Sequence, residues 1–189
     1  MNIYGKFVVL RAMEMEDCEL VINMFNDPEI ESLVVGWAFP LSLFSQRKWL
    51  EQHYNDQNAF RFVIDTKEDG PVGILALTDI DWKNRRASIG VKLDSKSSRF
   101  KGYGTDAIMA IMRYVFDELG LHRLDANRLA LNPISASVMK KCGFVQEGVK
   151  REYIYKGGKY RDLVEASILA DEYYELINTN HYWESDETR

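Results

Sequence analysis

The apolar and polar positions of this chain change period between residues 87 and 119. An apolar run over residues 89–93 predicts a strand, and five polar residues at 94–98 separate it from a glycine-containing turn. Beyond that turn the apolar side chains fall three, four, seven, eight and eleven positions after the first, which predicts a helix with one buried face: Ile108, Ile111, Met112, Val115, Phe116 and Leu119. A strand, a loop and a helix therefore follow one another at the centre of the chain.

The segments before this unit predict a small antiparallel sheet. Apolar residues dominate positions 59–65 and 72–81, and the turn-forming residues at 67–71 join these two strands into a hairpin. A second polar turn at 82–86 leads into a strand at 87–93. Together the three strands form an antiparallel meander.

The N-terminal part adds one strand and two helices to this prediction. The strand covers residues 7–11, and the acid-rich stretch after it opens a helix that ends before Pro28. A second helix covers residues 43–54. The aromatic segment at 33–40 has no helical period, so it either lines a pocket or packs in the core.

The part after the central helix returns to the sheet. Gly120 ends that helix, and the strand at residues 123–131 lies parallel to the strand at 87–93, because a helix connects the two. Asn132 and the proline after it predict the start of a helix over residues 134–142.

A hairpin with a Gly-Gly turn at residues 157–158 ends the predicted sheet, and the polar, acidic tail after it is expected to fray. The chain has 189 residues, of which 46% are hydrophobic and 12% aromatic, and this is enough for one domain with its own core. We therefore expect a single domain over residues 1–178 and a polar tail over residues 179–189.

Charge and cysteine content narrow the classes of function. A formal charge of −5 argues against sequence-independent nucleic-acid binding, which needs clustered cations, and mildly favours a cationic acceptor. Cys18 and Cys142 stand alone and the histidines are scattered, so we expect no metal site. The chain shows neither a signal segment nor an apolar run of about 18 residues, which predicts a cytoplasmic protein that does not act at a membrane.

Gly102 and Gly104 stand directly before the central helix. Two glycines there allow a tight turn and leave the first N–H groups of the helix unpaired at the positive end of its dipole. Such a turn binds an anion, most often a phosphate, and Arg99 and Lys101 add positive charge beside it.

Several loops of this kind are known, and two of them fit poorly. The nucleoside triphosphate loop needs G-x-x-x-x-G-K-[ST], which the chain lacks. The segment from Gly102 to Ala107 does match the dinucleotide fingerprint G-x-G-x-x-[GA], and Asp125 lies near the distance of a ribose-binding acid. A dinucleotide is nevertheless disfavoured, because polar residues separate the strand from Arg99 and because Asp125 lies inside its strand rather than at the end.

Arg99, Gly102 and Gly104 also match a third loop, R/Q-x-x-G-x-G/A, and other positions agree with the same family in order and spacing. These are Leu10, Arg11, Asp17, Asn132, Ser135, Val138, Lys141, Gly143, Phe144, Glu147, Gly148, Gly157 and Asp162. On these motifs, which span almost the whole chain, the sequence resembles the GNAT N-acetyltransferases. It is most similar to the branch that contains the ribosomal-protein alanine and the polyamine N-acetyltransferases.

The resemblance implies an α/β fold with a mixed, mostly antiparallel, seven-stranded sheet that is flanked by helices and splayed between its fourth and fifth strands. Here those strands are residues 87–93 and 123–131, and the pantetheine of acetyl-coenzyme A would lie between them. By position, the resemblance assigns cofactor binding to the backbone of Val91, Lys92 and Leu93, to the loop residues Arg99, Phe100, Lys101, Gly102, Tyr103, Gly104 and Thr105, and to Asn132, Ser135 and Lys141.

Acetyl transfer to an amine needs a base for the ammonium proton and stabilisation of the leaving thiolate. Many family members carry Glu where this chain has Ser88 and Tyr where it has Met139, so both usual groups are missing. Asp79 and Asp81 are the candidate bases, because residues two apart on a strand share a face and neighbouring like charges would raise one pKa. The candidate acid is Ser135.

The sequence thus favours an enzyme that moves acetyl from acetyl-CoA to a primary amine, which is a polyamine, another small amine or a peptide N-terminus. A non-catalytic sensor of coenzyme A stays open because of Ser88 and Met139, and a dinucleotide-dependent oxidoreductase is a weaker alternative. The acceptor stays unassigned, because the segments that would line its pocket carry none of the shared motifs. A homodimer or larger homo-oligomer is a further expectation.

Overall fold

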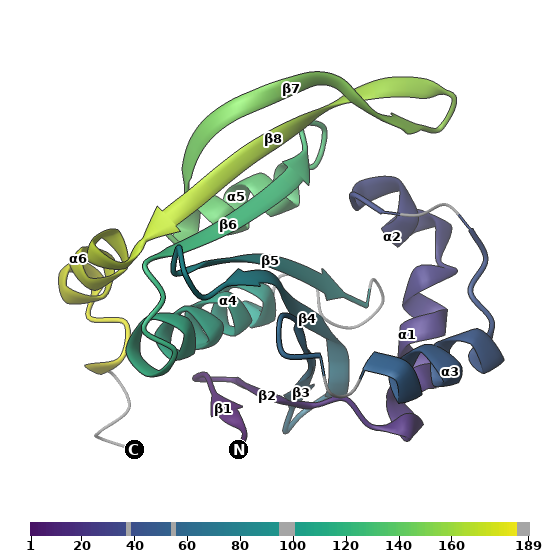
Figure 1. Ribbon diagram of the computed structural model, residues 1–189, viewed down its shortest axis with the longest axis horizontal. Coiled ribbons are helices and arrows are strands. Elements are labelled where there is room, and N and C mark those ends of the chain that lie inside the picture. The colour runs from purple at the N-terminus through teal and green to yellow at the C-terminus, as the bar shows by residue number, and fades with distance from the viewer. Residues whose placement is uncertain (37–38, 54–55, 95–100, 185–189) are drawn as a thin grey trace.

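The computed structural model describes residues 1–36, 39–53, 56–94 and 101–184 and contains one eight-stranded sheet flanked by helices (Figure 1). In chain order the strands are β1 Ile3–Tyr4, β2 Val8–Ala12, β3 Phe60–Thr66, β4 Gly70–Asp81, β5 Arg86–Leu93, β6 Arg123–Leu129, β7 Val145–Lys156 and β8 Lys159–Leu169. The α-helices are α1 Cys18–Phe25, α2 Pro28–Leu33, α3 Leu43–His53, α4 Tyr103–Arg113, α5 Pro133–Lys141 and α6 Ala170–Asn180. A 3₁₀ turn, Met15–Asp17, precedes α1, and a π-helical turn, Tyr114–Glu118, extends α4.

The strands lie in the order β1-β2-β3-β4-β5-β6-β8-β7, and all neighbours are antiparallel except β5 and β6. The predicted meander, the parallel strand after the central helix and the C-terminal hairpin are confirmed. The sheet has eight strands rather than seven, because β1 pairs with β2 as well. At two residues, β1 is too short to leave a pattern in the sequence.

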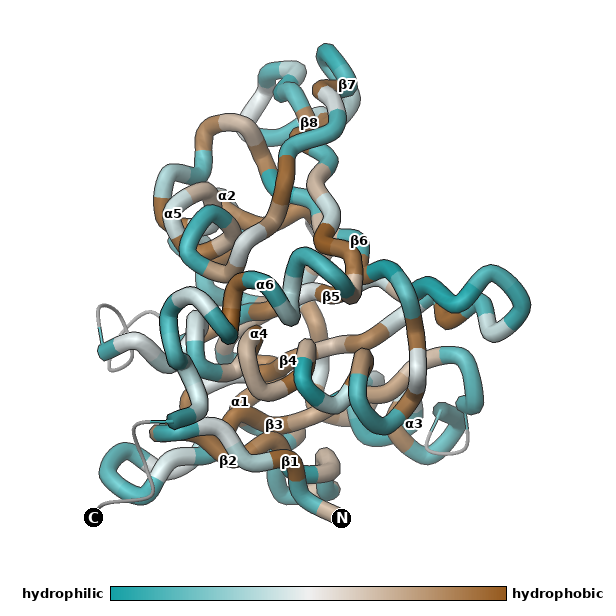
Figure 2. Tube along the Cα trace, turned by 90° about the vertical axis from the view of Figure 1, so that its left-hand side faces the viewer, coloured by the Kyte–Doolittle hydropathy of each residue, from teal (hydrophilic) through white to brown (hydrophobic). Residues whose placement is uncertain are grey.

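Helix α4 lies against β1, β2 and β5 and forms the centre of the core (Figure 1). The predicted apolar face is buried except for Leu119, which is half-buried, and Met109 and Ala110 outside that face are buried as well. Helix α5 and the C-terminal segment also pack around α4, which explains why the helix is covered on more sides than its pattern indicates. Hydrophobic residues accordingly concentrate along α4 and the central strands, whereas hydrophilic residues dominate α6 and the outer turns (Figure 2).

Asp27 and Pro28, which were predicted to end a helix, also begin the next helix, α2. Asp27 caps α2, since its side chain accepts the N–H of Glu29 at 2.8 Å, and Pro28 occupies the first turn of that helix. Helices α1, α2 and α3 form a group at one end of the sheet, where α1 lies against β4 (Figure 1).

The expected fraying after residue 178 is wrong for the residues up to 184. Helix α6 continues to Asn180, and Tyr182 then donates a hydrogen bond from its hydroxyl to Asp106 at 2.8 Å. The indole N–H of Trp183 donates to the hydroxyl of Tyr173 at 3.1 Å. Both aromatic side chains pack against the core, so this part of the tail covers α4. Within the described part of the chain, no helix is long and apolar enough to cross a membrane.

Candidate functional site

The sheet opens between β5 and β6. These strands pair in parallel only from Arg86 to Ile89, opposite Arg123 to Ala126. Beyond this point β5 continues to Leu93 along β4, and β6 pairs with β8 on its other edge. The splay predicted between these two strands is confirmed, and it leaves the last residues of β5 without a strand partner on the β6 side among the described residues.

The side chains of β5 alternate across the sheet at this opening. Val91 and Leu93 pack against the core beside α4, so a ligand in the opening would meet their backbone. Lys92 points to the opposite face, where its ammonium lies 3.8 Å from the centre of the Phe25 ring on α1.

The beginning of α4 presents N–H groups for which the described part of the chain provides no acceptor. Gly102 has a φ of +85°, which favours glycine, and no side chain caps the helix. The amide of Asp106 makes the first helical bond, to the carbonyl of Gly102, and the amides of Tyr103, Gly104 and Thr105 have no acceptor within the described ranges. A Cβ at Gly104 would lie 3.3 Å from Leu93 Cδ1, so these amides adjoin the open end of β5.

The charges around this loop differ from the prediction. The ammonium of Lys101 pairs with Asp69 at 2.6 Å, and the Tyr103 hydroxyl donates to the same carboxylate at 2.8 Å. The Lys101 hydrogen bond, followed by the Tyr103 hydrogen bond, lowers the pKa of Asp69, so this carboxylate stays charged and offsets Lys101. Arg99 and Phe100, also assigned to the cofactor, lie outside the described residues.

Helix α5 borders the same opening. Asn132 caps it by accepting the amide of Ser135 at 3.0 Å, as predicted, and its side-chain NH₂ donates to the carbonyl of Leu33 at 2.9 Å. Asn132 therefore ties α5 to the end of α2, a role that its helix-capping pattern does not reveal. At the other end of α5, Lys141 is exposed, and its neighbour Cys142 contacts the carbonyl of Thr105 in α4.

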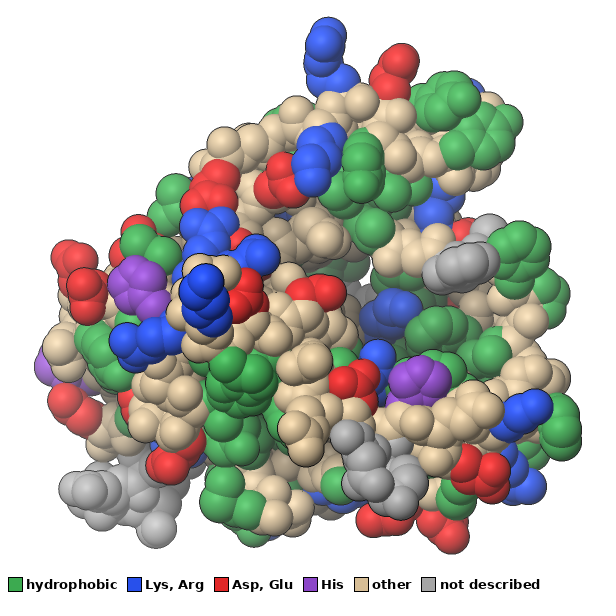
Figure 3. Space-filling view, viewed as in Figure 1, with side chains coloured by type: hydrophobic (Ala, Val, Ile, Leu, Met, Phe, Trp, Pro, Cys, Tyr) green, Lys and Arg blue, Asp and Glu red, His purple; other side chains and the backbone are tan. Residues whose placement is uncertain are grey.

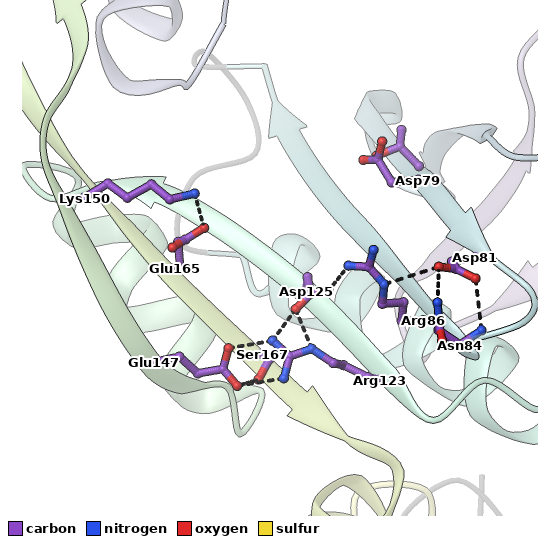
Figure 4. A network of polar contacts seen from close by, with 11 residues as sticks. Asp79, Asp81, Asn84, Arg86, Arg123, Asp125, Glu147, Lys150, Glu165 and Ser167 are labelled. Carbon is purple, nitrogen blue, oxygen red and sulfur yellow. Dashed lines mark hydrogen bonds and ion pairs between the residues drawn. The ribbon is translucent and has the colours of Figure 1, made fainter.

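Asp79 and Asp81 do not form the pair that was expected. A register shift separates them, Asp79 has a φ of +53°, and Figure 4 shows their carboxylates well apart. Asp79 is exposed and accepts the Thr78 hydroxyl at 2.9 Å. Asp81 instead holds the turn after β4, where its carboxylate accepts the backbone N–H and side-chain NH₂ of Asn84.

The expected rise in pKa is therefore wrong for Asp81. Hydrogen bonds from the side chain and backbone of Asn84, with a smaller contribution from Arg86, lower the pKa of Asp81 below its usual value. A carboxylate with a lowered pKa is a weaker base, which leaves Asp79 as the better of the two candidates.

A chain of ion pairs crosses the sheet beyond these residues (Figure 4). Arg86 lies 3.9 Å from Asp125, and Arg123 binds Asp125 and Glu147, each at 2.7 Å. The hydrogen bonds from Arg123, and then from Ser167, lower the pKa of Glu147 to about 2. Asp125 lies in the middle of β6 and is paired with Arg86 and Arg123. It is therefore not available to bind the ribose of a dinucleotide.

Comparison of the sequence with models of protein families identifies the family of this chain. The profile of the acetyltransferase (GNAT) domain matches residues 8–145, which is most of the chain. The chain belongs to the GNAT acetyltransferases.

Two relatives and one solved structure show the similarity in more detail. The chain is 27% identical to the spermidine N(1)-acetyltransferase of Vibrio cholerae over 167 residues, which cover 88% of this chain and 95% of the relative. It is 24% identical to the ribosomal protein uS5-alanine N-acetyltransferase of Escherichia coli over 144 residues, which cover 73% and 69%. The crystal structure of spermidine N-acetyltransferase from Vibrio cholerae with CoA and spermine matches with a TM-score of 0.84, at 25% identity, over 90% of this chain and 99% of that chain. The suspected branch of the GNAT family is therefore confirmed.

A small pocket of this GNAT protein lies on the face of the sheet to which Lys92 points. The described residues that line it come from α1, α2, the segment after α2 and β5: Met24, Phe25, Ile30, Glu31, Val34, Gly36 and Lys92. Figure 3 shows a hollow between the β7–β8 hairpin and helices α1 to α3, with hydrophobic and basic side chains inside it. Burial, and then the nearby charge of Lys156, lower the pKa of Lys92 from 10.5 to about 8.

Lys156 closes one side of this region. It lies at the end of β7, is buried, and donates to both the backbone carbonyl and the carboxylate of Glu31 on α2. This contact joins the β7–β8 hairpin to α2. It also pairs Glu31, the acidic residue of the pocket lining, with a cation from outside the lining.

Lys92 was assigned to the cofactor through its backbone, and the position of its side chain was missed. The sequence does hold a signal for it, because Lys92 interrupts the apolar run of β5 between Val91 and Leu93. A lysine at that place in a central strand must direct its ammonium to the other face of the sheet.

Proposed function

We propose that this GNAT acetyltransferase transfers acetyl from acetyl-CoA to a primary amine. One observation carries the proposal: the unpaired end of β5 lies beside the uncapped first turn of α4. The first offers backbone groups to an extended pantetheine chain, and the second offers amides to a pyrophosphate. The related spermidine acetyltransferase from Vibrio cholerae, whose crystal structure contains CoA and spermine, supports both the cofactor and an amine acceptor.

The residues of the opening fit this cofactor. The amides of Tyr103, Gly104 and Thr105 would bind the pyrophosphate, and Asp69 keeps Lys101 beside them. The backbone of residues 91–93 would hold the pantetheine and the acetyl carbonyl. Arg99, Phe100, Asn132, Ser135 and Lys141 complete the proposed set. The cofactor itself supplies the activated acyl group.

The protein must also move two protons. We assign the ammonium proton of the acceptor to Asp79 rather than Asp81, because Asp79 is exposed at the irregular part of β4 and is not engaged with the following turn. Ser135, in the first turn of α5 next to the opening, is the proposed proton donor to the leaving thiolate. Its backbone N–H donates to the side chain of Asn132, the residue is half-buried, and its hydroxyl is the group that would act.

Release of free thiol from acetyl-CoA, followed with a panel of amines and Ala- or Ser-initiated peptides, tests the activity. Thiol release that depends on an amine, together with an acetylated product, is the expected result. Acetyl-CoA at 100 times its dissociation constant should also stabilise the fold by roughly 2.7 kcal/mol. Stabilisation without thiol release for any amine would indicate a sensor of coenzyme A, and stabilisation by NAD alone would contradict the cofactor.

Self-association and a cytoplasmic location remain proposals. The edge strand β7 exposes several large apolar side chains, which supports contact with a second copy: Val145, Val149, Tyr153 and Tyr155. Light scattering on the purified protein tests the first, with a mass above 21.9 kDa as the expected result. Cell fractionation tests the second.

A further inference from the structure

The pocket beside β5 contains one ammonium group, that of Lys92, without a carboxylate partner among the described residues. Its lining is apolar except for Glu31 and Lys92. Glu31 is already paired with Lys156, whereas Lys92 rests on the Phe25 ring and has no carboxylate partner among the described residues. An incoming ligand therefore meets the ammonium of Lys92 and not a free acid.

This charge lies on the face of the sheet opposite α4, and we take this face as the one across which the acceptor approaches. Lys92 belongs to the unpaired part of β5, and its side chain lies on the face opposite α4. An amine that reaches the opening across this face would place its distal end near the pocket. A second ammonium at that end would be repelled, whereas a carboxylate would pair with a cation that is partly shielded from water.

We propose that Lys92 selects the acceptor, and that the preferred acceptor is an amine with a carboxylate at its far end rather than a polyamine. The inference rests on the proposed acetyl transfer. The chemical class of acceptor is an ω-aminoalkanoate, in which the amine and the carboxylate stand at opposite ends of the carbon chain.

Matched acceptors test this selection. Aminoalkanoates of three to six carbons are compared with diamines and monoamines of the same length, and kcat/KM is measured for each. The aminoalkanoate should exceed the diamine by about tenfold or more, which corresponds to roughly 1.4 kcal/mol. Lys92→Met should bring the ratio close to one, and Lys92→Glu should reverse it. Lys83→Met, which removes an exposed lysine from the turn at the other end of β5, should keep the wild-type ratio.

A wild-type preference for diamines, or an unchanged ratio in Lys92→Met, would overturn the proposal. Binding of the same ligands to the protein with CoA, measured by calorimetry, separates specificity from catalysis. Preferential binding of the aminoalkanoate that is lost in Lys92→Met supports the role of Lys92 even if no amine is acetylated, and that outcome would contradict the transferase proposal alone. Equal binding of aminoalkanoate and diamine would overturn the selection by Lys92.

Discussion

The two sides of the site are built from different parts of the chain. On the cofactor side, the ligand would meet mainly backbone: the unpaired end of β5 and the amides of the first turn of α4. On the acceptor side, it would meet side chains: Lys92 on Phe25, and the Glu31–Lys156 pair that joins α2 to the hairpin. Contacts made by backbone groups depend on the path of the chain and on glycine at the turn. Contacts made by a side chain are lost or altered when that residue is replaced.

This difference gives each side its own behaviour under mutation. A change on the cofactor side should weaken the use of every acceptor by the same factor. A change on the acceptor side should alter the ranking of acceptors and leave the affinity for acetyl-CoA as it was. The following tests separate the two kinds of effect.

The largest expected effect is on proton transfer. Asp79→Asn removes the proposed base with little change in shape, so kcat at pH 7 should fall by roughly a hundredfold. The loss should shrink as the pH rises, because more acceptor is then already neutral. Asp81→Asn is the matched control: it should keep kcat within a few-fold and lower the melting temperature, since Asp81 holds the turn at Asn84. Equal losses of kcat in both variants would contradict the assignment.

The next largest effect is expected from a negative charge at Gly102, beside the proposed phosphate-binding turn. A Cβ at Gly102 would meet open space, so Gly102→Asp can place a carboxylate beside the uncapped amides without a clash. Its repulsion of a pyrophosphate should raise the KM for acetyl-CoA about thirtyfold relative to Gly102→Asn, which has nearly the same shape and tolerance of a φ of +85° but no charge. The factor should be the same for every acceptor. A factor that differs among acceptors would mean that the two sides are not independent.

A smaller effect is expected from the hairpin contact. Lys156→Met frees the Glu31 carboxylate at the edge of the pocket, so the preference for aminoalkanoates over diamines should fall by about threefold to tenfold. The double variant Lys156→Met/Glu31→Gln removes both charges and should restore most of the preference. Unchanged ratios in both variants would show that the acceptor does not sense Glu31.

The last expected effect is on the stability of the fold rather than on activity. Because burial lowers the pKa of Lys92 to about 8, the unfolded chain binds its proton more tightly, and Lys92 costs stability below that pH. Lys92→Met should therefore raise the free energy of unfolding at pH 7, by about 1 to 3 kcal/mol. The gain should diminish as the pH rises from 8 toward the ordinary lysine value of 10.5. Thermal melts at several pH values measure it, and a variant less stable than the wild type at pH 7 would contradict the cost.

The sequence predicts the strands and helices of the proposed cofactor side well, because these depend on the path of the backbone. Helix period, strand alternation and the glycines before α4 determine the path of the backbone, so the meander and the cap at Asn132 follow from local pattern, whereas the splay was implied by the family resemblance. The charge of Lys101 was misjudged, because Asp69 reaches it from a turn 32 residues away. Such a contact has no local signature.

The acceptor side could be predicted far less. Whether Asp79 and Asp81 share a face depends on a register shift in β4, which strict alternation cannot reveal. The Lys156–Glu31 contact joins residues 125 apart in the chain. Helix α2 is short, and Asp27 and Pro28 at its start could equally indicate the end of the helix before it. The direction of Lys92 could be predicted from alternation in β5, but the ring and the pocket around it come from α1 and α2.

Hydrogen exchange of the backbone amides, with and without CoA, tests the central claim most directly. If the cofactor lies in the opening of the sheet, its addition should slow exchange at Tyr103, Gly104 and Thr105 and at the β5 amides beyond Ile89. Exchange along β8, which is paired with β6 and β7 in either state, should stay the same. Slower exchange elsewhere, with no change at the first turn of α4, would contradict the proposed cofactor site.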